Sequence, residues 1–533
     1  MSGGLTERSN AQLPEAVLVA IDARLARAAD EAVAERIFAR DDTLWGPAGQ
    51  PEVADRLGWL DAHDRLSGNA VQLLAVAAQA YVDGFRHVVV LGMGGSSLAP
   101  EVFRQSFPAK PDGLTLHILD STDAQAVRDI EAAIPLAETI FIASSKSGGT
   151  LETLSALEHF WEATGRNSQQ FCAITDPGSG LERLANEREF RNVFSGDPEI
   201  GGRYSALSPF GIVPAAFAGY DIAALLAGGS AVSEACREPD PEVNPGLHLG
   251  CVLAVLAQAH RDKLTFIVDE PVASFGLWVE QLTAESLGKH GKGILPVAGE
   301  PVGAPETYGD DRVFVAIEGP AAEHGDAVAA LAAAGFPVIT MSVESANDLG
   351  ALMVLWEFAI AVAGWALELN PFDQPNVQSA KDKTMEVLAG EPPRIEPATA
   401  ESLTALFAAG PSSYLAIQGY TAPNDEIDAA IAELRAAIRD QTKMATTFGY
   451  GPRYLHSTGQ LHKGGPKTGR FLQLVSDSQP DITVGGAAGT FETLKRAQAD
   501  GDLLVLREHG LPTERVMLGA DPVATIQQLK EYL

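Results

Sequence analysis

The chain has 533 residues, of which 46% are hydrophobic and 20% charged, a composition typical of globular proteins. This length exceeds what one hydrophobic core supports, so we expect several domains. The net charge of −32 argues against nucleic acid and against an anionic membrane surface as partners.

The cysteines and the first residues do not indicate an exported protein. Cys172, Cys236 and Cys251 are too widely spaced for a disulfide framework or a cysteine-based zinc site. Residues 1–8 contain no basic segment followed by an apolar one, and the sequence has no run of 18 apolar residues. We therefore expect a soluble, cytoplasmic protein.

Helical patterns come first and give way to an alternation of strands and helices. Helices are predicted at 14–38, 51–59 and 68–82. From residue 85, short apolar runs alternate with amphipathic stretches, which is typical of a parallel sheet covered by helices. The strands expected in this first unit are 87–91, 114–119, 139–143 and 171–175.

A second series of the same kind follows, and then a smaller α/β segment. The second series has expected strands at 264–268, 294–297, 313–317 and 338–341, with helices at 275–287, 321–334 and 346–367. Proline-rich residues 391–397 mark a boundary. Beyond them we expect strands at 414–419, 471–476 and 503–507 and helices at 424–441 and 490–500. We therefore predict that the chain divides into four parts: an N-terminal helical segment (1–84), a first α/β domain (85–225), a second α/β domain (226–392) and a C-terminal α/β extension (393–533).

The stretch 144–153, SSKSGGTLET, lies where a predicted strand turns into a helix. Backbone N–H groups at a helix N-terminus favour a phosphate, and glycines allow the backbone to approach it. Ser145, Ser147 and Thr150 can each donate a further hydrogen bond. The order of residues differs from that of the nucleotide P-loop. This stretch therefore predicts a site for the phosphate of a small molecule.

A second glycine-rich loop, GMGGSS at 92–97, follows the strand expected at 87–91. In open α/β sheets, ligands bind beyond the carboxyl ends of the strands, where both loops lie. A dinucleotide fingerprint would require a third glycine where Ser97 stands. Asp120 lies just after the next strand, where an acidic residue could bind the ribose of a nicotinamide dinucleotide. This cofactor therefore stays open as an alternative ligand.

Four motifs occur in a telling order: GGS at 94–96, GGRYS at 201–205, QLTAESLGK at 281–289 and FDQPNVQSAK at 372–381. With the phosphate loop they resemble glucose-6-phosphate isomerase, which is built from two sugar-isomerase (SIS) domains. The stretch 448–466 is similar to the isomerase half of the fused bacterial transaldolase/phosphoglucose isomerase. Only about 80 residues precede the first expected strand, too few for a transaldolase barrel of roughly 250 residues, so we expect isomerase activity alone.

The resemblance implies an α/β fold of two SIS-type doubly wound parallel-sheet domains, with an N-terminal helical segment and a C-terminal α/β extension. It implies a cofactor-free, metal-independent isomerase that interconverts glucose 6-phosphate and fructose 6-phosphate through an enediolate. Glu285 would be the base, Arg203 would stabilise the enediolate, and Lys381 would assist ring opening. The substrate contacts implied are Ser96, Ser145, Lys146, Ser147, Thr150, Glu152, Gln281 and Gln374.

The ring-opening histidine of the family has no counterpart in the expected place. The equivalent stretch, YGDDR at 308–312, contains no histidine. Asp311, His456 and His462 are the candidates for this role. We prefer His462, because it lies in the glycine-rich part of its loop. A zinc pair formed by His456 and His462 would need further ligands that we cannot place, so no metal is expected.

Two alternatives to this function stay open. One is another SIS-type isomerase, acting for instance on mannose 6-phosphate, and the other is a non-catalytic phosphosugar-binding regulator. The presence of Glu285, Arg203 and Lys381 favours catalysis, because a binding protein needs no base. The partners expected are a hexose phosphate, a second copy of the chain in a homodimer, and a separate transaldolase. The family's ring-opening residues can come from the neighbouring subunit.

Overall fold

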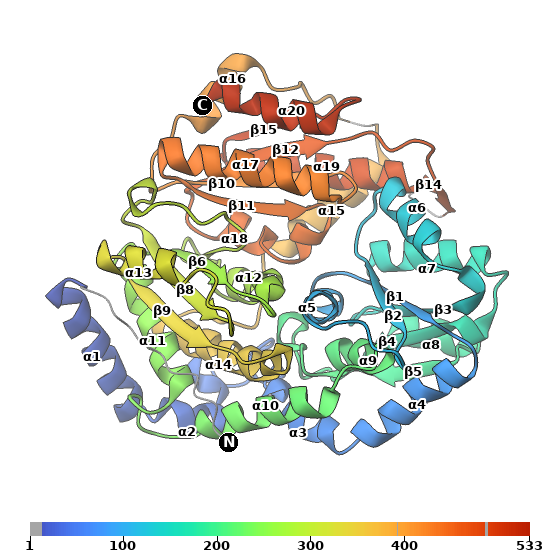
Figure 1. Cartoon of the computed structure of the whole chain (residues 1–533), viewed down its shortest axis with the longest axis horizontal. Coiled ribbons are helices and arrows are strands. Elements are labelled where there is room, and N and C mark those ends of the chain that lie inside the picture. Colours follow the sequence, from blue (N-terminus) through green and yellow to red (C-terminus); the bar gives the residue numbers. More distant parts are fainter. Residues whose placement is uncertain (1–12, 392, 486–488) are drawn as a thin grey trace.

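The computed structural model describes residues 13–391, 393–485 and 489–533. Residues 1–8, discussed above, and Pro392 of the proline-rich boundary lie outside these ranges. Three parallel sheets with their helices surround a common centre, and the N-terminal helices run beneath two of them (Figure 1). The α/β class with several parallel sheets is therefore confirmed.

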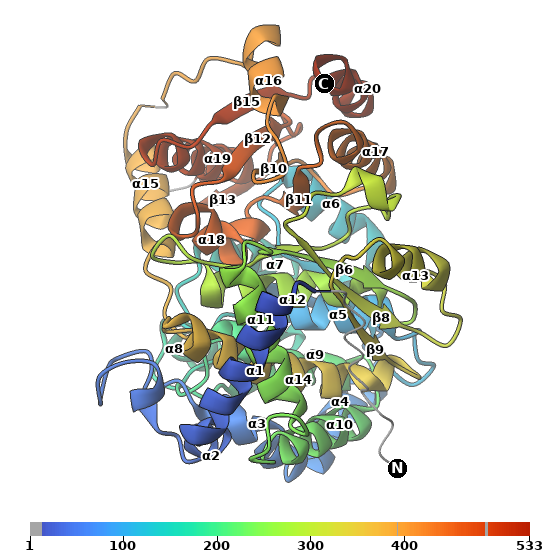
Figure 2. The same ribbon diagram turned by 90° about the vertical axis from the view of Figure 1, so that its left-hand side faces the viewer.

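The N-terminal segment is helical but more broken than expected. Its helices are α1 (Glu15–Asp30), α2 (Val33–Phe38), α3 (Ala62–Ser67) and α4 (Ala70–Val82). The helix predicted at 14–38 is interrupted at Ala32, whose φ of 50° is left-handed. The helix predicted at 51–59 is instead a series of turns ending in a 3₁₀ helix, Gly58–Asp61. Helix α1 crosses α11 (Pro245–Gln258), as Figure 2 shows.

The first sheet has the order β2-β1-β3-β4-β5, with all strands parallel. Its strands are β1 (His87–Gly92), β2 (Thr115–Leu119), β3 (Thr139–Ser144), β4 (Phe171–Thr175) and β5 (Asn192–Ser195). The helices of this unit are α5 (Leu98–Ser106), α6 (Ala124–Ala133), α7 (Leu151–Ala163), α8 (Gly180–Glu187) and α9 (Pro209–Phe217). The four expected strands are present, and β3 is buried along its whole length.

The second sheet has the order β7-β6-β8-β9, again parallel. Its strands are β6 (Lys263–Val268), β7 (Leu295–Val297), β8 (Arg312–Glu318) and β9 (Val338–Ser342). Its helices are α10 (Ile222–Ala235), α11, α12 (Gly276–Leu287), α13 (Gly325–Ala333) and α14 (Leu349–Leu367). The segment Ala346–Leu367 is long and apolar enough to cross a membrane, yet 94% of it is buried inside the protein. It therefore serves as a core helix that packs against α10 and α11.

The third sheet has the order β11-β10-β12-β15. Its strands are β10 (Tyr414–Tyr420), β11 (Ala445–Tyr450), β12 (Gly469–Val475) and β15 (Thr513–Met517), beside a small hairpin of β13 (Thr483–Gly485) and β14 (Gly489–Thr490). Its helices are α15 (Val377–Ala389), α16 (Ala400–Phe407), α17 (Asp425–Thr442), α18 (Gly459–Gly464), α19 (Phe491–Glu508) and α20 (Pro522–Gln528). Strands β11 and β15 were not expected from the sequence.

One strand predicted in this segment is wrong. Residues 503–507 are not a strand but the end of α19, which is continuous from Phe491 to Glu508. An apolar run of this length suits a strand and a buried helix equally, and packing decides between them. A Cβ atom on Gly501 would lie 3.0 Å from the backbone nitrogen of Thr384, so α19 packs closely against α15 there.

The three sheets place their first four strands in the same spatial order, second-first-third-fourth along the chain. The order reverses beside the first strand of each sheet, and such a switch point opens a crevice at the carboxyl ends of the strands. Two ion pairs connect the C-terminal sheet to the first unit, and the one between Lys495 and Asp123 is fully buried. Lys495 lies 2.8 Å from Asp123, and Arg453 lies 2.7 Å from Asp120.

Candidate active site

The glycine-rich loop after β1 brings three segments of the chain together. A Cβ atom on Gly95 would lie 1.9 Å from the carbonyl oxygen of Gly202, so only glycine allows this loop to contact the loop that carries Arg203. Gly94 has a φ of +56°, and its Cβ would lie 2.8 Å from the carbonyl oxygen of His456. Ser96 ends this turn and is buried.

The expected phosphate loop follows β3, and α7 begins at its end, as the sequence indicates. The hydroxyls of Ser145 and Thr150 are 2.9 Å apart, whereas Ser147 is exposed. Gly148 has a φ of +69°, and a Cβ atom there would lie 2.8 Å from the backbone nitrogen of Leu181. The loop is therefore tightly shaped, with its hydroxyls at a helix N-terminus that favours an anion.

Lys146 does not point freely into this loop. Its Nζ atom lies 2.5 Å from a carboxylate oxygen of Asp176 and donates to the carbonyl oxygen of Asp197 at 2.7 Å. Burial lowers the pKa of Lys146, and the ion pair with Asp176 opposes this change. Because its charge is paired with Asp176, Lys146 connects the phosphate loop to the neighbouring loops instead of offering a free cation to a ligand.

A cavity of about 210 Å³ opens beside the phosphate loop. Its polar lining comes from Ser147, Thr150, Glu152, Lys381, Thr384, His456 and Gln498. Three separate parts of the chain thus meet here: the first unit, α15 with the exposed Lys381, and the C-terminal segment.

Within this cavity a histidine, a carboxylate and an amide form a chain of hydrogen bonds. Nε2 of His456 lies 3.0 Å from Oε1 of Glu152, and Nε2 of Gln498 donates to the same oxygen at 2.8 Å. Thr122 donates to Oε1 of Gln498 at 2.7 Å. Burial raises the pKa of Glu152, but the neighbouring His456 lowers it by more than burial raises it. The pKa of Glu152 therefore lies below its usual value. Glu152 is therefore a carboxylate that orients the imidazole ring.

Glu285 lies near the end of α12 with its side chain 12% exposed. Its Oε1 atom is 3.4 Å from Nη1 of Arg203, and its Oε2 accepts a hydrogen bond from Nε2 of Gln281 at 3.1 Å. The same Nε2 of Gln281 donates to the carbonyl oxygen of His456 at 2.7 Å. Gln281 therefore links the expected base to the segment that carries His456.

Arg203 is only 2% exposed and is held in one position. Its guanidinium donates to the hydroxyl of Ser286 at 2.8 Å and to the carbonyl oxygens of Pro371 at 2.7 Å and Asp373 at 2.9 Å. A further hydrogen bond to Oε1 of Gln374 is 2.9 Å long. The arginine therefore presents a fixed, permanent positive charge beside Glu285.

The structure does not bring two of the ring-opening candidates to this cavity. His462 is buried against Tyr414 and Phe471, with Nδ1 lying 3.0 Å from the Tyr414 hydroxyl, and burial lowers its pKa to about 3. Asp311 precedes β8 at the amino end of the sheet, 3.7 Å from Lys263. Of the three candidates it is His456, and not the preferred His462, that lines the cavity.

Two features of this site were not expected from the sequence. Gln498 lies on a helix that was predicted, but the helical pattern gives no sign that this side chain reaches Glu152. The position of His456 depends on β11, which was not predicted. A β-branched and aromatic run, ATTFGY, forms this strand and was the available signal. Because His456 follows β11 closely, it lies at the carboxyl edge of the third sheet.

In the described part of the chain, one group of side chains could hold a metal ion: Asp269, Glu323 and His324. Asp269 already lies 2.6 Å from Nδ1 of His324. None of the three lines the cavity at Glu152 and His456.

Comparison with known proteins agrees with these motifs. The profile of the family described as phosphoglucose isomerase matches residues 76–295. The glucose-6-phosphate isomerase of Rubrobacter xylanophilus is 31% identical over 369 residues, which cover 58% of this chain and 84% of that protein. The glucose-6-phosphate isomerase of a Synechococcus strain is 29% identical over 351 residues, covering 57% of this chain and 66% of that protein.

Solved structures show the same architecture. A hypothetical protein of Thermus thermophilus superimposes with a TM-score of 0.60 and 26% identity, over 72% of this chain and all of that protein. A glucose-6-phosphate isomerase of Chlamydia trachomatis, 19% identical, shares the fold with a TM-score of 0.54, over 67% of this chain and 78% of that one. The motifs, their geometry and the Rubrobacter relative together show that this chain belongs to the phosphoglucose isomerase family.

Proposed function

We propose that the chain interconverts glucose 6-phosphate and fructose 6-phosphate by moving a proton between C1 and C2 of the open-chain sugar. One observation carries the proposal. Gln281 connects the Glu285 carboxylate, which lies beside Arg203, to His456 in the cavity next to the phosphate loop. A base, a fixed cation, an acid/base group and an anion site are the parts that this reaction needs.

The proton transfer is assigned to Glu285. Its carboxylate takes the proton from one carbon and returns it to the other, while negative charge develops on the neighbouring oxygen. Arg203 stabilises that charge without exchanging a proton, because a guanidinium stays protonated in proteins. The substrate phosphate is held at Ser145, Ser147 and Thr150, where the backbone N–H groups of the α7 N-terminus add to the attraction.

Ring opening is assigned to His456, in place of His462. When Nε2–H donates to Glu152, Nδ1 is left to exchange a proton with the sugar ring. Lys381 lines the same cavity and supplies a cation near the ring oxygen. The remaining substrate contacts proposed are Ser96, Gln281 and Gln374, with Lys146 acting through its support of the loop.

The test is turnover of fructose 6-phosphate, coupled to glucose-6-phosphate dehydrogenase, in the presence of EDTA. The wild-type chain should be active, and Glu285→Gln should abolish turnover while binding of the phosphosugar persists. Glu426→Gln, at an exposed position of α17, is the matched control and should behave like wild type. Full activity of Glu285→Gln would overturn the assignment of the base.

Two companion measurements separate the alternatives: mannose 6-phosphate turnover with an added glucose-6-phosphate isomerase as coupling enzyme, and direct binding of the phosphosugar. Turnover of mannose 6-phosphate alone would indicate a different SIS-type isomerase, and phosphosugar binding without turnover would indicate a regulator. We further propose a cytoplasmic location, a homodimer and the division into 1–84, 85–225, 226–392 and 393–533. A separate transaldolase is also a proposed partner, to be tested by co-purification.

A further inference from the structure

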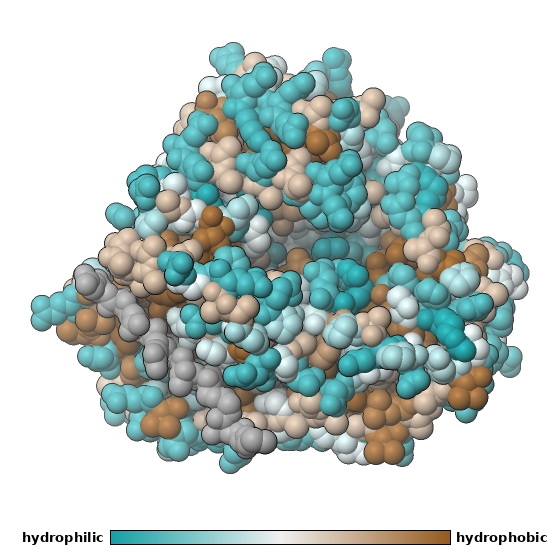
Figure 3. Space-filling view, viewed as in Figure 1, coloured by the Kyte–Doolittle hydropathy of each residue, from teal (hydrophilic) through white to brown (hydrophobic). Residues whose placement is uncertain are grey.

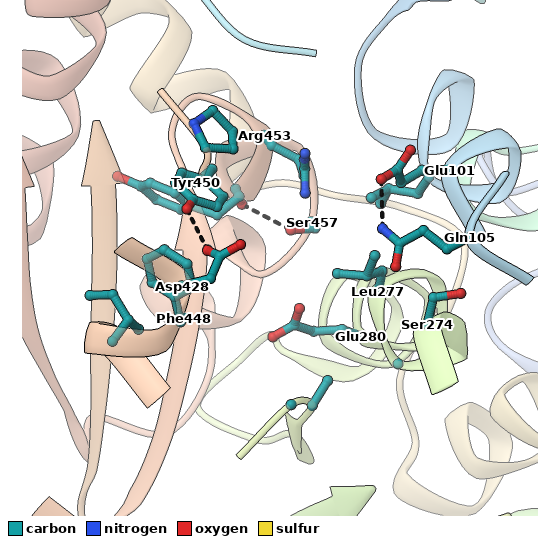
Figure 4. Close-up of a pocket in the computed structure, with 18 of the residues that line it drawn as sticks. Glu101, Gln105, Ser274, Leu277, Glu280, Asp428, Phe448, Tyr450, Arg453 and Ser457 are labelled. Atoms are coloured by element: carbon teal, nitrogen blue, oxygen red, sulfur yellow. Dashed lines mark hydrogen bonds between the residues drawn. The ribbon is translucent and has the colours of Figure 1, made fainter. Parts of the chain in front are cut away.

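A second, larger cavity of about 690 Å³ lies where the three sheets meet. In Figure 3 the surface is hollowed at this central position. The walls come from α5, α12 and the C-terminal segment, as the close-up in Figure 4 shows. Residues that face it include Gln105, Leu277, Glu280, Phe448, Tyr450 and Arg453. The phosphate loop, Lys381 and Glu152 do not line this cavity, so it is separate from the catalytic one.

Glu280 is an unpartnered carboxyl group in this cavity. It is 8% exposed and points from α12 into the open space in Figure 4. Among the described residues, none forms a hydrogen bond or ion pair with it; burial raises its pKa to about 8, with Arg435 and Arg453 acting against that rise. To a molecule that enters the cavity, Glu280 therefore presents a hydrogen-bonding group that no described residue uses.

The cations of the cavity are already engaged. Arg104 lies 2.7 Å from Glu101, and Arg453 lies 2.7 Å from Asp120. Arg435 donates to the carbonyl oxygens of two residues in the loop after β7, at 2.7 and 2.8 Å. Arg104 and Arg453 are therefore paired with carboxylates, and the N–H groups of Arg435 are occupied by neutral oxygens, so an anionic ligand would find no free N–H fork among them. A cationic ligand beside Glu280 would face Arg435 and Arg453, which act on that carboxyl group.

The polar lining that remains includes two carboxylates, Asp425 and Asp428, of which Asp428 accepts a hydrogen bond from Tyr450, and several uncharged groups that suit hydroxyls. A protonated Glu280 can both donate and accept. The amide of Gln105 and the hydroxyls of Ser274 and Ser457 are uncharged; they already donate within the protein, and their oxygens can still accept from a ligand. The rings of Phe448 and Tyr450 offer apolar faces beside them. This combination of aromatic faces with neutral donors and acceptors fits a small molecule with many hydroxyls and no charge.

Two elements form a wall between this cavity and the active site. Helix α12 carries Leu277 and Glu280 on one side and Gln281 on the side that reaches His456. The 3₁₀ helix Arg453–His456 places Arg453 in the larger cavity and His456 in the catalytic one. The hydrogen bond from Gln281 to His456 joins these two elements. An occupant that changes their spacing would therefore change how His456 sits relative to Glu285.

We propose that this cavity is a second binding site, for an uncharged polyhydroxylated small molecule, and that its occupant acts on the active site through α12 and the 3₁₀ helix Arg453–His456. The binding itself is independent of the proposed isomerase activity, whereas the effect on turnover rests on it. The two parts are therefore measured separately.

Binding is measured by calorimetry on Glu285→Gln with glucitol and myo-inositol as probes, while fructose 6-phosphate saturates the catalytic cavity. Binding should persist under saturation and weaken by about tenfold or more in Leu277→Trp and in Glu280→Leu, a loss of about 1.4 kcal/mol or more. Glu426→Leu, outside the cavity, should bind like the parent. If Leu277→Trp fails to fold, polyol binding to Glu280→Leu, which is the smaller change in side-chain volume, still tests the proposed site.

The proposal is overturned if fructose 6-phosphate displaces the polyol, if both cavity variants bind like the parent, or if neither polyol binds. Binding of inorganic phosphate or spermidine alone would overturn the ligand class. In wild-type enzyme, a saturating polyol should change kcat for fructose 6-phosphate at least twofold without competing with it, and Leu277→Trp should lose this response. An unchanged kcat with a filled cavity would refute the coupling but leave the binding site.

Discussion

The imidazole of His456 and the carboxylate of Glu152 meet at 3.0 Å although they are 304 positions apart in the sequence. Glu152 belongs to the helix that begins at the phosphate loop, and His456 follows a strand of the C-terminal sheet. The first unit therefore supplies the proposed phosphate site and the carboxylate that orients the imidazole, and the last segment supplies the proposed acid/base group.

We expect His456→Gln to slow turnover of cyclic fructose 6-phosphate by roughly 10² or more, because a general acid or base typically contributes that much. The same variant should act nearly normally on 5-deoxyfructose 6-phosphate, which lacks the hydroxyl that closes the furanose ring. The measurement is the ratio of the two rates. His290→Asn, at an exposed histidine, is the control. An equal loss on both substrates would remove His456 from ring opening.

Gln498 is expected to be a positioning residue, since it donates to Glu152 at 2.8 Å. Gln498→Met removes a hydrogen bond that favours the charged form of Glu152, so the pKa of that carboxyl group should rise. The acidic limb of the pH–kcat profile should then move towards neutral pH. Gln169→Met, at an exposed position, should leave the profile unchanged. A lower rate with an unmoved profile would indicate a merely structural effect.

Arg203→Lys should lower kcat by about 10² to 10³ with a smaller change in KM, because the cation stabilises charge that appears only in the transition state. Lysine cannot reproduce the guanidinium fork that binds Ser286, Pro371 and Asp373 together. Arg394→Lys, whose side chain is 89% exposed, should match wild type. A change confined to KM would argue for a role in binding alone.

Gly95→Ala should abolish activity or destabilise the fold, whereas Gly202→Ala should be tolerated. The new Cβ at position 95 would lie 1.9 Å from the Gly202 carbonyl oxygen, but a Cβ at position 202 meets no heavy atom within 4 Å. Thermal unfolding and turnover of the two variants check this pair. Similar behaviour of both would show that the two loops are not in close contact.

His462 should make stability depend on pH. Its folded-state pKa of about 3 lies below the unfolded value of 6.5, so the unfolded state binds more protons between these values and stability falls as the pH falls below 6.5. One such group changes the free energy of unfolding by about 2 kcal/mol between about pH 6.5 and 5. Urea unfolding of His462→Gln should lack this contribution, whereas His290→Asn should retain it. Equal slopes in wild type and His462→Gln would contradict the prediction.

The sequence predicted the first two sheets well because most of their strands are short, apolar and buried. It predicted the contacts of the last segment poorly. Leu503 to Arg507 suit a strand or a buried helix, and only the packing of Gly501 against Thr384 decides for α19. His456 and His462 differ by six positions, and their surroundings depend on β11, which turns one towards Glu152 and leaves the other against Tyr414.

The motif residues could be identified from the sequence, but their hydrogen-bond and ion-pair partners could not. Lys146 stands in the phosphate loop as expected, yet its ammonium group is paired with Asp176, a residue from the loop after β4. Gln374 likewise lies beside Arg203 as expected, yet its amide also binds Glu52 of the N-terminal segment at 2.9 Å. Such pairings depend on the tertiary arrangement and leave no local pattern.

The position of His456 has one last consequence. The resemblance drawn from the sequence implied that a ring-opening residue can come from a neighbouring subunit, in which case each site would need two chains. Here the histidine, its carboxylate and the base all come from one polypeptide. The proposed site is therefore assembled within one chain, and dilution of the proposed homodimer into single chains should leave the specific activity unchanged.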